Sequence, residues 1–254
     1  MKAIVLKCSE LAVGYREKTI LTDISFSLPE GTFTVFVGAN GSGKSTLLRT
    51  LAGQQPPLAG KVEICGKPIG DYGRRSLAKV RALVDTSRYG GGALTVGEAV
   101  AVGRYAFTGW TGLLSKDDKA IVADALGSVG MLSYIDRHLA SLSDGERQKV
   151  MIARALAQQT PLIILDEPTA FLDVAARLDI MKMLRRLVDG GKTVLLSTHD
   201  IAPAVAQADM ILAVDPSRHT AVLGNRDVMI ADGSLDRTFA ASGLRFDASV
   251  LDYR

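Results

Sequence analysis

The sequence contains only two cysteines, Cys8 and Cys65, and a single tryptophan among 254 residues. The two cysteines lie far apart and have no neighbours at metal-ligand spacing, which argues against a disulfide framework and a cysteine-based metal site. We expect both to be buried free thiols. No apolar run approaches the roughly 18 residues that cross a bilayer. Any connection to a membrane is therefore expected to come through a partner.

The chain also lacks a strong charge of either sign. Its net charge is +3, and its charged residues, 22% of the total, mix both signs without a basic tail or stripe. This distribution gives no indication of a nucleic-acid partner. A hydrophobic content of 47% is that of an ordinary globular protein. The apolar start at residues 1–6 is too short for a signal peptide and is followed by Lys7, so we expect a strand there.

The clearest pattern is a glycine-rich loop at residues 38–45. It fits G-x-x-x-x-G-K-[ST] at every fixed position, between a β-prone run at 32–37 and a helix-prone run at 45–52. Glycines let backbone N–H groups turn towards an anion, and a helix N-terminus adds partial positive charge. A turn without a ligand is the alternative, but the flanks favour a loop that binds a nucleoside triphosphate. The predicted binding residues are Gly38, Ala39, Asn40, Gly41, Ser42, Gly43, Lys44, Ser45 and Thr46, with Lys44 on the β- and γ-phosphates and Ser45 on Mg²⁺.

Strand and helix patterns alternate around this loop. Continuous apolar runs at 162–165, 193–197 and 210–214 predict a buried parallel sheet, and residues 77–84 are ambiguous between strand and helix. The predicted fold is α/β, a P-loop NTPase core of mainly parallel sheet wrapped by helices, with an antiparallel N-terminal portion and an inserted helical subdomain. We expect one domain over 1–254, with the core at about 1–86 and 150–225, the helical subdomain at about 87–149 and a helical tail at 226–254.

Polar residues follow two of the buried runs. Asp166 and Glu167 come directly after one, and His199 comes after the next, so all three are expected at the sheet edge where ligands of open α/β sheets bind. Asp166 would orient Mg²⁺, Glu167 would act as general base on water, and His199 could contact the γ-phosphate or hold the attacking water. Solvated acids are the alternative for Asp166 and Glu167, and the upstream loop favours the catalytic interpretation of these two. For His199 the alternative is a polar residue that caps the next helix, and its position alone does not favour catalysis.

Two further patterns are ambiguous taken alone. Ser143-x-x-Glu146 is a capping box ahead of an apolar-periodic helix, and it is equally an anion site at a helix N-terminus. Tyr15 precedes the glycine-rich loop by 23 positions; it could stack on an adenine or belong to the protein's own packing.

In the order and spacing of these motifs, the whole chain resembles the ATP-binding subunit of an ABC transporter. The loop at 38–45 corresponds to Walker A, residues 162–167 to Walker B and its glutamate, residues 142–146 to the signature, residues 171–173 to the D-loop, and His199 to the switch histidine. The resemblance implies that the chain is an ATPase, that Tyr15 stacks on adenine, and that Glu167 and His199 are catalytic together with Lys44. It also implies that Ser143, Gly145, Glu146 and Asp173 contribute to the nucleotide site.

The resemblance implies partners as well. Two copies would sandwich two ATP molecules head to tail, close on binding ATP and reopen on hydrolysis. They would dock on transmembrane permease subunits at the cytoplasmic face of the plasma or inner membrane, with a periplasmic or extracellular binding protein delivering the substrate. Residues 95–105, 142–157 and 243–246 are most similar to importers of iron-siderophore chelates, haem or cobalamin. A soluble ABC-type ATPase of a non-transport system and an ATP-dependent dimerisation switch are the alternatives.

The sequence departs from the family pattern at two places. The signature has Asp144 and Glu146 where glycine and glutamine are common, and we expect Arg147 or Lys149 to offset their charge. Asp85-Thr86 replaces the Q-loop glutamine. Thr86 would bind Mg²⁺ or its water with shorter reach, or Asp85 would substitute as a carboxylate ligand, and in either case hydrolysis is expected to be slower or differently coupled. The permease is expected to dock near residues 86–105, where Arg88 and Arg104 would face it.

Overall fold

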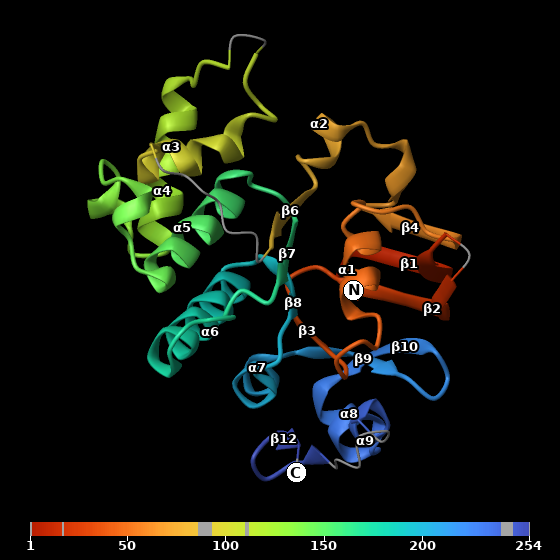
Figure 1. Cartoon of the computed structure of the whole chain (residues 1–254). Coiled ribbons are helices and arrows are strands. Elements are labelled where there is room, and N and C mark those ends of the chain that lie inside the picture. Colours follow the sequence, from red (N-terminus) through yellow and green to blue (C-terminus); the bar gives the residue numbers. More distant parts are fainter. Residues whose placement is uncertain (1, 17, 86–92, 110–111, 240–245, 254) are drawn as a thin grey trace.

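A six-stranded sheet forms the centre of the molecule (Figure 1). The computed structural model describes residues 2–16, 18–85, 93–109, 112–239 and 246–253. Neighbouring strands from β9 to β6 are parallel, and β10 is antiparallel to β9. The strand order is β10 (Thr220–Asn225), β9 (Met210–Asp215), β3 (Phe33–Val37), β8 (Thr193–Ser197), β7 (Leu162–Asp166) and β6 (Arg81–Val84).

The sheet is buried on both faces, as its continuous apolar strands predict. Alternate residues of β7 point to opposite sides: Ile163 belongs to the core under the long helices, and Ile164 to the core under α1. The first core includes apolar residues of α5 (Asp144–Ala157), α6 (Val174–Asp189) and α7 (Ile201–Gln207). The second joins α1 (Lys44–Leu51) to the N-terminal strands. The α/β prediction is confirmed.

The N-terminal strands form a separate antiparallel sheet beside α1, as predicted (Figure 1). Its order is β2 (Lys18–Pro29), β1 (Ile4–Tyr15), β4 (Ala59–Ile64) and β5 (Lys67–Pro68). Cys8 is buried within it, but Cys65 lies exposed in the turn between β4 and β5, so the expectation of two buried thiols is wrong for Cys65. Turn residues face solvent because their backbone groups need water as a partner.

A helical block lies beyond β6, at the upper left of Figure 1. It contains α3 (Val96–Ala101), the 3₁₀ turn η2 (Val102–Arg104), α4 (Lys116–Ser128) and the start of α5, and it shares the larger core. Thr95 and Ser115 begin α3 and α4 with capping boxes. The ambiguous residues 77–84 divide into the end of α2 (Arg74–Leu77) and strand β6. Short 3₁₀ turns complete the chain at η1 (Ile69–Asp71), η3 (Leu132–Tyr134) and η4 (Leu139–Ser141).

The described part of the tail, which was expected to be helical, contains the short helices α8 (Arg226–Ala231) and α9 (Ser234–Phe239). It also contains a small hairpin, β11 (Phe246–Asp247) with β12 (Asp252–Tyr253), which sequence periodicity did not indicate. The Phe246 backbone N–H donates to Asp236 at 2.8 Å, which attaches the hairpin to α9. Among the described residues, no helix is both long and apolar enough to cross a bilayer.

Candidate functional site

The glycine-rich loop connects the central strand β3 to α1. Gly41 and Gly43 have φ angles of 75° and 100°, in the region where a side chain is strained. A Cβ at Gly43 would also lie 2.6 Å from Ile20 Cγ2 of β2. Glycine at this position therefore allows the antiparallel sheet to approach the helix start closely, with the loop held between the two sheets.

Lys44, at the start of α1, is only 7% exposed. Its Nζ donates to the carbonyl oxygens of Gly38 at 2.5 Å and Ala39 at 3.0 Å. Burial lowers the pKa of the Lys44 ammonium, and the charges of Glu167 and Asp166 act in the opposite direction. A cation thus lies inside the loop, within the electrostatic reach of both carboxylates.

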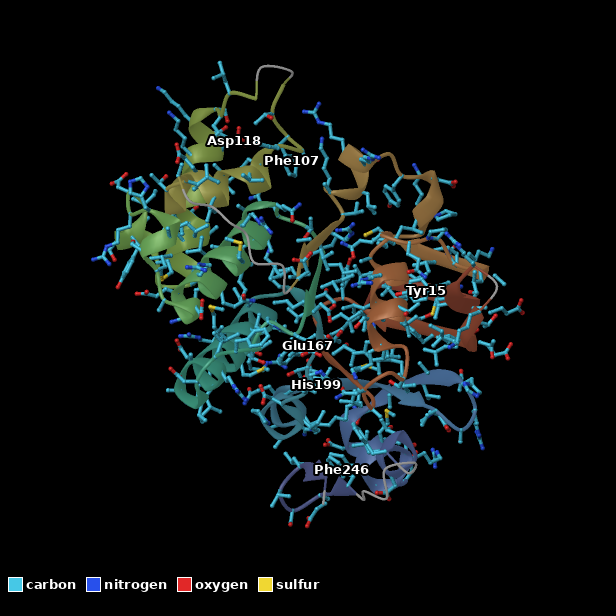
Figure 2. The ribbon with its side chains drawn as sticks, viewed as in Figure 1. Tyr15, Phe107, Asp118, Glu167, His199 and Phe246 are labelled. Carbon is cyan, nitrogen blue, oxygen red and sulfur yellow. The ribbon has the colours of Figure 1, made fainter. Side chains whose placement is uncertain are left out.

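The carboxyl ends of β7 and β8 bring the predicted acids and His199 together, and Figure 2 shows Glu167 next to His199. Asp166 is opposite Ser197 in the ladder, and the Ser197 hydroxyl donates to Asp166 Oδ1 at 2.5 Å. His199 Nε2 lies 2.5 Å from Glu167 Oε1. Burial raises the pKa of the Glu167 carboxyl, while the nearby His199 and Lys44 lower it and Asp166 raises it further. This is the arrangement that a general base with a positioning histidine requires.

Tyr15 lies at the end of β1, beside α1. Its side chain is 48% exposed, and its hydroxyl accepts a hydrogen bond from Thr46 Oγ1 at 3.3 Å. That hydrogen bond lowers the pKa of the Tyr15 phenol. The exposed ring next to the loop is available to a planar ligand, and its position is fixed from the loop side by Thr46.

The signature and D-loop residues begin two other helices. Ser143 caps α5, and its hydrogen bonds are to Glu146, so the capping box predicted for these residues is present. Asp173 caps α6 and accepts from the Ala176 N–H at 2.8 Å. Gly145 lies near the start of α6, since a Cβ there would be 3.4 Å from Ala176 Cβ. The chain therefore places these residues at two helix N-termini outside the Lys44 and Glu167 cluster.

Sequence reasoning missed a network behind His199. Arg177 of α6 donates from Nε to the Leu172 carbonyl and from Nη1 to Asp200 Oδ1, both at 2.7 Å. Thr169 Oγ1 donates to the other carboxylate oxygen of Asp200 at 3.1 Å. This network joins the D-loop to the residue after His199. The sequence contained only one indication of this network, which was the position of Arg177 four residues after Asp173, in the first turns of the helix.

Several expectations about charge need correction. Arg104 is 5% exposed and donates to Asp118 at 2.8 Å, so it does not face a docking partner. Lys149 pairs with Asp179 of α6 at 2.5 Å and not with the signature acids. Arg147 does lie 3.8 Å from Asp144. Thr86 and Arg88 lie outside the described residues.

The fold and the site define a P-loop ATPase whose loop lysine is opposite a glutamate and a histidine from neighbouring strands. A family model described as "ABC transporter" matches residues 21–170, more than half of the sequence, so the chain belongs to the ABC transporter family. It is an ATP-binding subunit that hydrolyses ATP, which confirms the resemblance drawn from the motifs.

The chain is similar to ATP-binding proteins of known transporters. It is 38% identical over 210 residues to the iron(3+)-hydroxamate import ATP-binding protein FhuC of Bacillus subtilis, covering 82% of this chain and 78% of the relative. It is 33% identical over 232 residues to the ferric enterobactin transport ATP-binding protein FepC of Escherichia coli, covering 89% and 84%. An ABC transporter described as of metal-chelate type, in an inward-facing conformation, superposes with a TM-score of 0.80 at 28% identity over 94% of this chain and 90% of that one.

Proposed function

We propose that this protein hydrolyses ATP to power a membrane importer of an iron chelate of the siderophore type. The observation that carries the proposal is the approach of Glu167 to His199 at the sheet edge, with the Lys44 cation inside the adjacent loop. The relatives that transport ferric hydroxamate and ferric enterobactin favour this cargo class and favour transport over a non-transport role. Haem and cobalamin find no support in the names of these relatives.

Each loop residue has a role in this proposal. The N–H groups of residues 38–46 and the Lys44 ammonium bind the triphosphate, and Tyr15 stacks on the adenine. The oxygens of Ser45 and Asp166 are hard donors of the kind that Mg²⁺ prefers, and the Ser197 hydroxyl orients the Asp166 carboxylate. A bound Mg²⁺ would neutralise charge on the phosphates. Thr86, expected as a further ligand, lies outside the described residues.

Hydrolysis follows from the Glu167 and His199 geometry. A water placed between Glu167 and the γ-phosphate gives up its proton to Glu167 Oε as its oxygen bonds to phosphorus, and the bond to the β-phosphate oxygen breaks. His199 holds the Glu167 carboxylate through its Nε2. The raised pKa of Glu167 makes it a stronger base than an ordinary glutamate.

A second copy of the chain completes the site in this proposal. Ser143 and Gly145 of one copy would cap the γ-phosphate bound to the other copy's loop, with Asp173 next to the shared interface. Because only the γ-phosphate would contact both copies, its loss would remove the preference for the closed dimer. Transmembrane permease subunits would hold this dimer at the cytoplasmic face of the membrane, and a separate binding protein would deliver the chelate.

The test is uptake in proteoliposomes that contain the permease and the ATPase subunit. We expect ATP-dependent uptake of a ferric hydroxamate or catecholate chelate, and Glu167→Gln should reduce ATP turnover more than about 100-fold without loss of nucleotide binding. Asp117→Asn, at an exposed carboxylate of α4, is the control and should turn over ATP normally. Turnover that survives Glu167→Gln would contradict the catalytic assignment, and uptake of zinc in place of the chelate would contradict the cargo.

A further inference from the structure

The signature serine, Ser143, donates two hydrogen bonds to the Glu146 carboxylate. Ser143 N–H lies 2.9 Å and Ser143 Oγ 2.8 Å from the same carboxylate oxygen, Glu146 Oε2. The Glu146 backbone N–H in turn donates to Ser143 Oγ at 3.3 Å. These contacts lower the pKa of the Glu146 carboxyl, with smaller contributions from the Tyr134 hydroxyl and the Arg137 charge. Glu146 is therefore an anion at neutral pH.

This geometry conflicts with a second acceptor on the same hydroxyl. A serine hydroxyl has one proton to donate, and here Glu146 accepts it. A phosphate oxygen at hydrogen-bonding distance from Ser143 Oγ would also lie roughly 5 Å from the Glu146 carboxylate. The phosphate must therefore compete with Glu146 for the hydrogen bond that the Ser143 hydroxyl donates. It must also approach the negative charge of the Glu146 carboxylate.

The neighbouring charges do not remove this repulsion. Asp144 adds a second, largely exposed carboxylate to the first turn of α5, and Arg147 approaches it only to 3.8 Å. Arg147 Nη2 instead donates to the Leu142 carbonyl at 3.3 Å. Lys149 pairs with Asp179 of α6. The Arg137 charge also acts on the Glu146 carboxyl, but it is the smallest of the contributions to the pKa of that group. Besides Arg137, the attraction for a phosphate comes from the helix N-terminus, whose first N–H groups have no intrahelical partner.

We propose that Glu146 is a specificity-determining residue that holds the Ser143 hydroxyl away from nucleotide and thereby raises the ATP concentration at which two copies close. The inference rests on the proposed function, since Ser143 acts on a nucleotide only in the two-copy site. Two copies of the subunit therefore stay open at ATP concentrations that would close a dimer with a neutral glutamine at position 146. Glutamine preserves the acceptor for the Ser143 N–H and removes the charge.

The test compares Glu146→Gln with Glu98→Gln, each in a Glu167→Gln chain that keeps ATP intact. Glu98 is the matched control because it makes the same capping box with Thr95 at the start of α3, outside the proposed site. The fraction of dimer is measured by sedimentation as ATP is increased. We expect Glu146→Gln to lower the ATP concentration at half-dimer by about tenfold, as removal of a charge close to a phosphate predicts. Glu98→Gln should leave it unchanged.

Salt provides a second readout that a structural role would not change. Raising the salt concentration from about 0.05 M to about 0.5 M screens charge repulsion. The ATP concentration at half-dimer should then differ less between the chain with Glu146 and the chain with Glu146→Gln. An unchanged or higher half-dimer concentration in Glu146→Gln, or an equal shift in Glu98→Gln, would overturn the inference. If no variant dimerises at saturating ATP, the proposed two-copy site itself fails, and the role of Glu146 fails with it.

Discussion

At the scale of single residues, Gly43 is the position where the loop has least freedom to change. Its φ of 100° and the 2.6 Å approach of a Cβ to Ile20 leave no room for a side chain. We predict that Gly43→Ala destabilises the protein by about 3 kcal/mol and weakens ATP binding, because both backbone strain and a clash are introduced. Urea denaturation and nucleotide titration measure the two effects.

The control for Gly43 is Gly66, in the turn between β4 and β5. Gly66 has a comparable φ of 76°, but a Cβ there would meet nothing within 4 Å. Gly66→Ala should therefore cost only the strain, about 1 kcal/mol, and leave ATP binding intact. Equal losses of stability in the two variants would show that the clash with Ile20 is unimportant.

A second residue-scale prediction concerns the Glu167 carboxyl. Burial raises its pKa above the ordinary 4.5, and His199 opposes that shift. The general base is therefore protonated, and ATP hydrolysis falls, at a higher pH than an ordinary glutamate would give. His199→Gln removes the opposing charge, so the pKa should rise further. Carbon-13 NMR titration of the carboxyl measures both values without relying on activity, and a pKa at or below 4.5 in the native protein would contradict the prediction.

At the scale of elements, three of the described helices begin with the same capping box, at Thr95, Ser115 and Ser143. The box at Ser115 has an additional function. Its third residue, Asp118, accepts from Arg104 Nε at 2.8 Å, and Arg104 also donates to the Ala157 carbonyl at 2.8 Å. The start of α4 is thereby joined to η2 and to the end of α5.

Asp118 gives a prediction with a defined pH window. Hydrogen bonds from Ser115 and Arg104 lower its pKa from 3.8 to about 2. A carboxylate whose pKa is lowered by folding stabilises the folded state at pH values above its unfolded pKa. For Asp118 this contribution disappears as the pH falls from 3.8 to about 2. Asp118→Asn should therefore melt well below the native protein at pH 7, and the difference should shrink below pH 4. A difference that is independent of pH would contradict the ionic role.

The elements also show where sequence patterns were sufficient. Helices α4, α5 and α6 begin at side-chain caps, and the capping box predicted at Ser143 correctly marked the start of α5. The partly exposed strand β10 and the two-residue strands β11 and β12 have no such period. Arg104 was expected at the surface because its partner, Asp118, is 14 residues away on another helix.

At the scale of the whole molecule, contacts of Phe107 connect the helical block to the residues before β6. The Phe107 ring contacts two cations, with Arg104 Cζ 4.0 Å and Lys79 Nζ 5.1 Å from its centroid. Figure 2 places Phe107 beside Asp118 in the helical block. Nearby, Arg75 Nε donates to the Ala106 carbonyl at 3.0 Å.

We predict that Phe107→Ala lowers the free energy of unfolding by about 2 kcal/mol, from two lost cation–π contacts and lost packing. Amides of α3 should exchange with solvent faster, while those of β3 should not change. The control is Tyr105→Ala, since Tyr105 is 58% exposed compared with 37% for Phe107. It should change stability by less than about 0.5 kcal/mol. Similar exchange rates in both variants would count against the role of Phe107.

The candidate site was predictable in outline because its motifs follow strand ends. The rule that parallel strands end at one edge predicts from the sequence alone that Asp166, Glu167 and His199 lie together. The rule does not give strand order, so the Ser197 bond to Asp166 could not be foreseen. The two hydrogen bonds from Ser143 to Glu146 were expected as a cap, but the competition they create for the hydroxyl proton depends on distances that a pattern does not contain.

The strand order determines when the protein becomes functional during its synthesis. The glycine-rich loop follows β3, which pairs with β8 and β9, and those strands lie more than 150 residues later in the chain. A ribosome therefore releases the loop long before the strands that flank β3 exist, and the apolar β3 does not have both neighbours until residue 215 has emerged. Nucleotide binding is acquired late in translation, and fragments that end before β8 will hold the whole motif without the site.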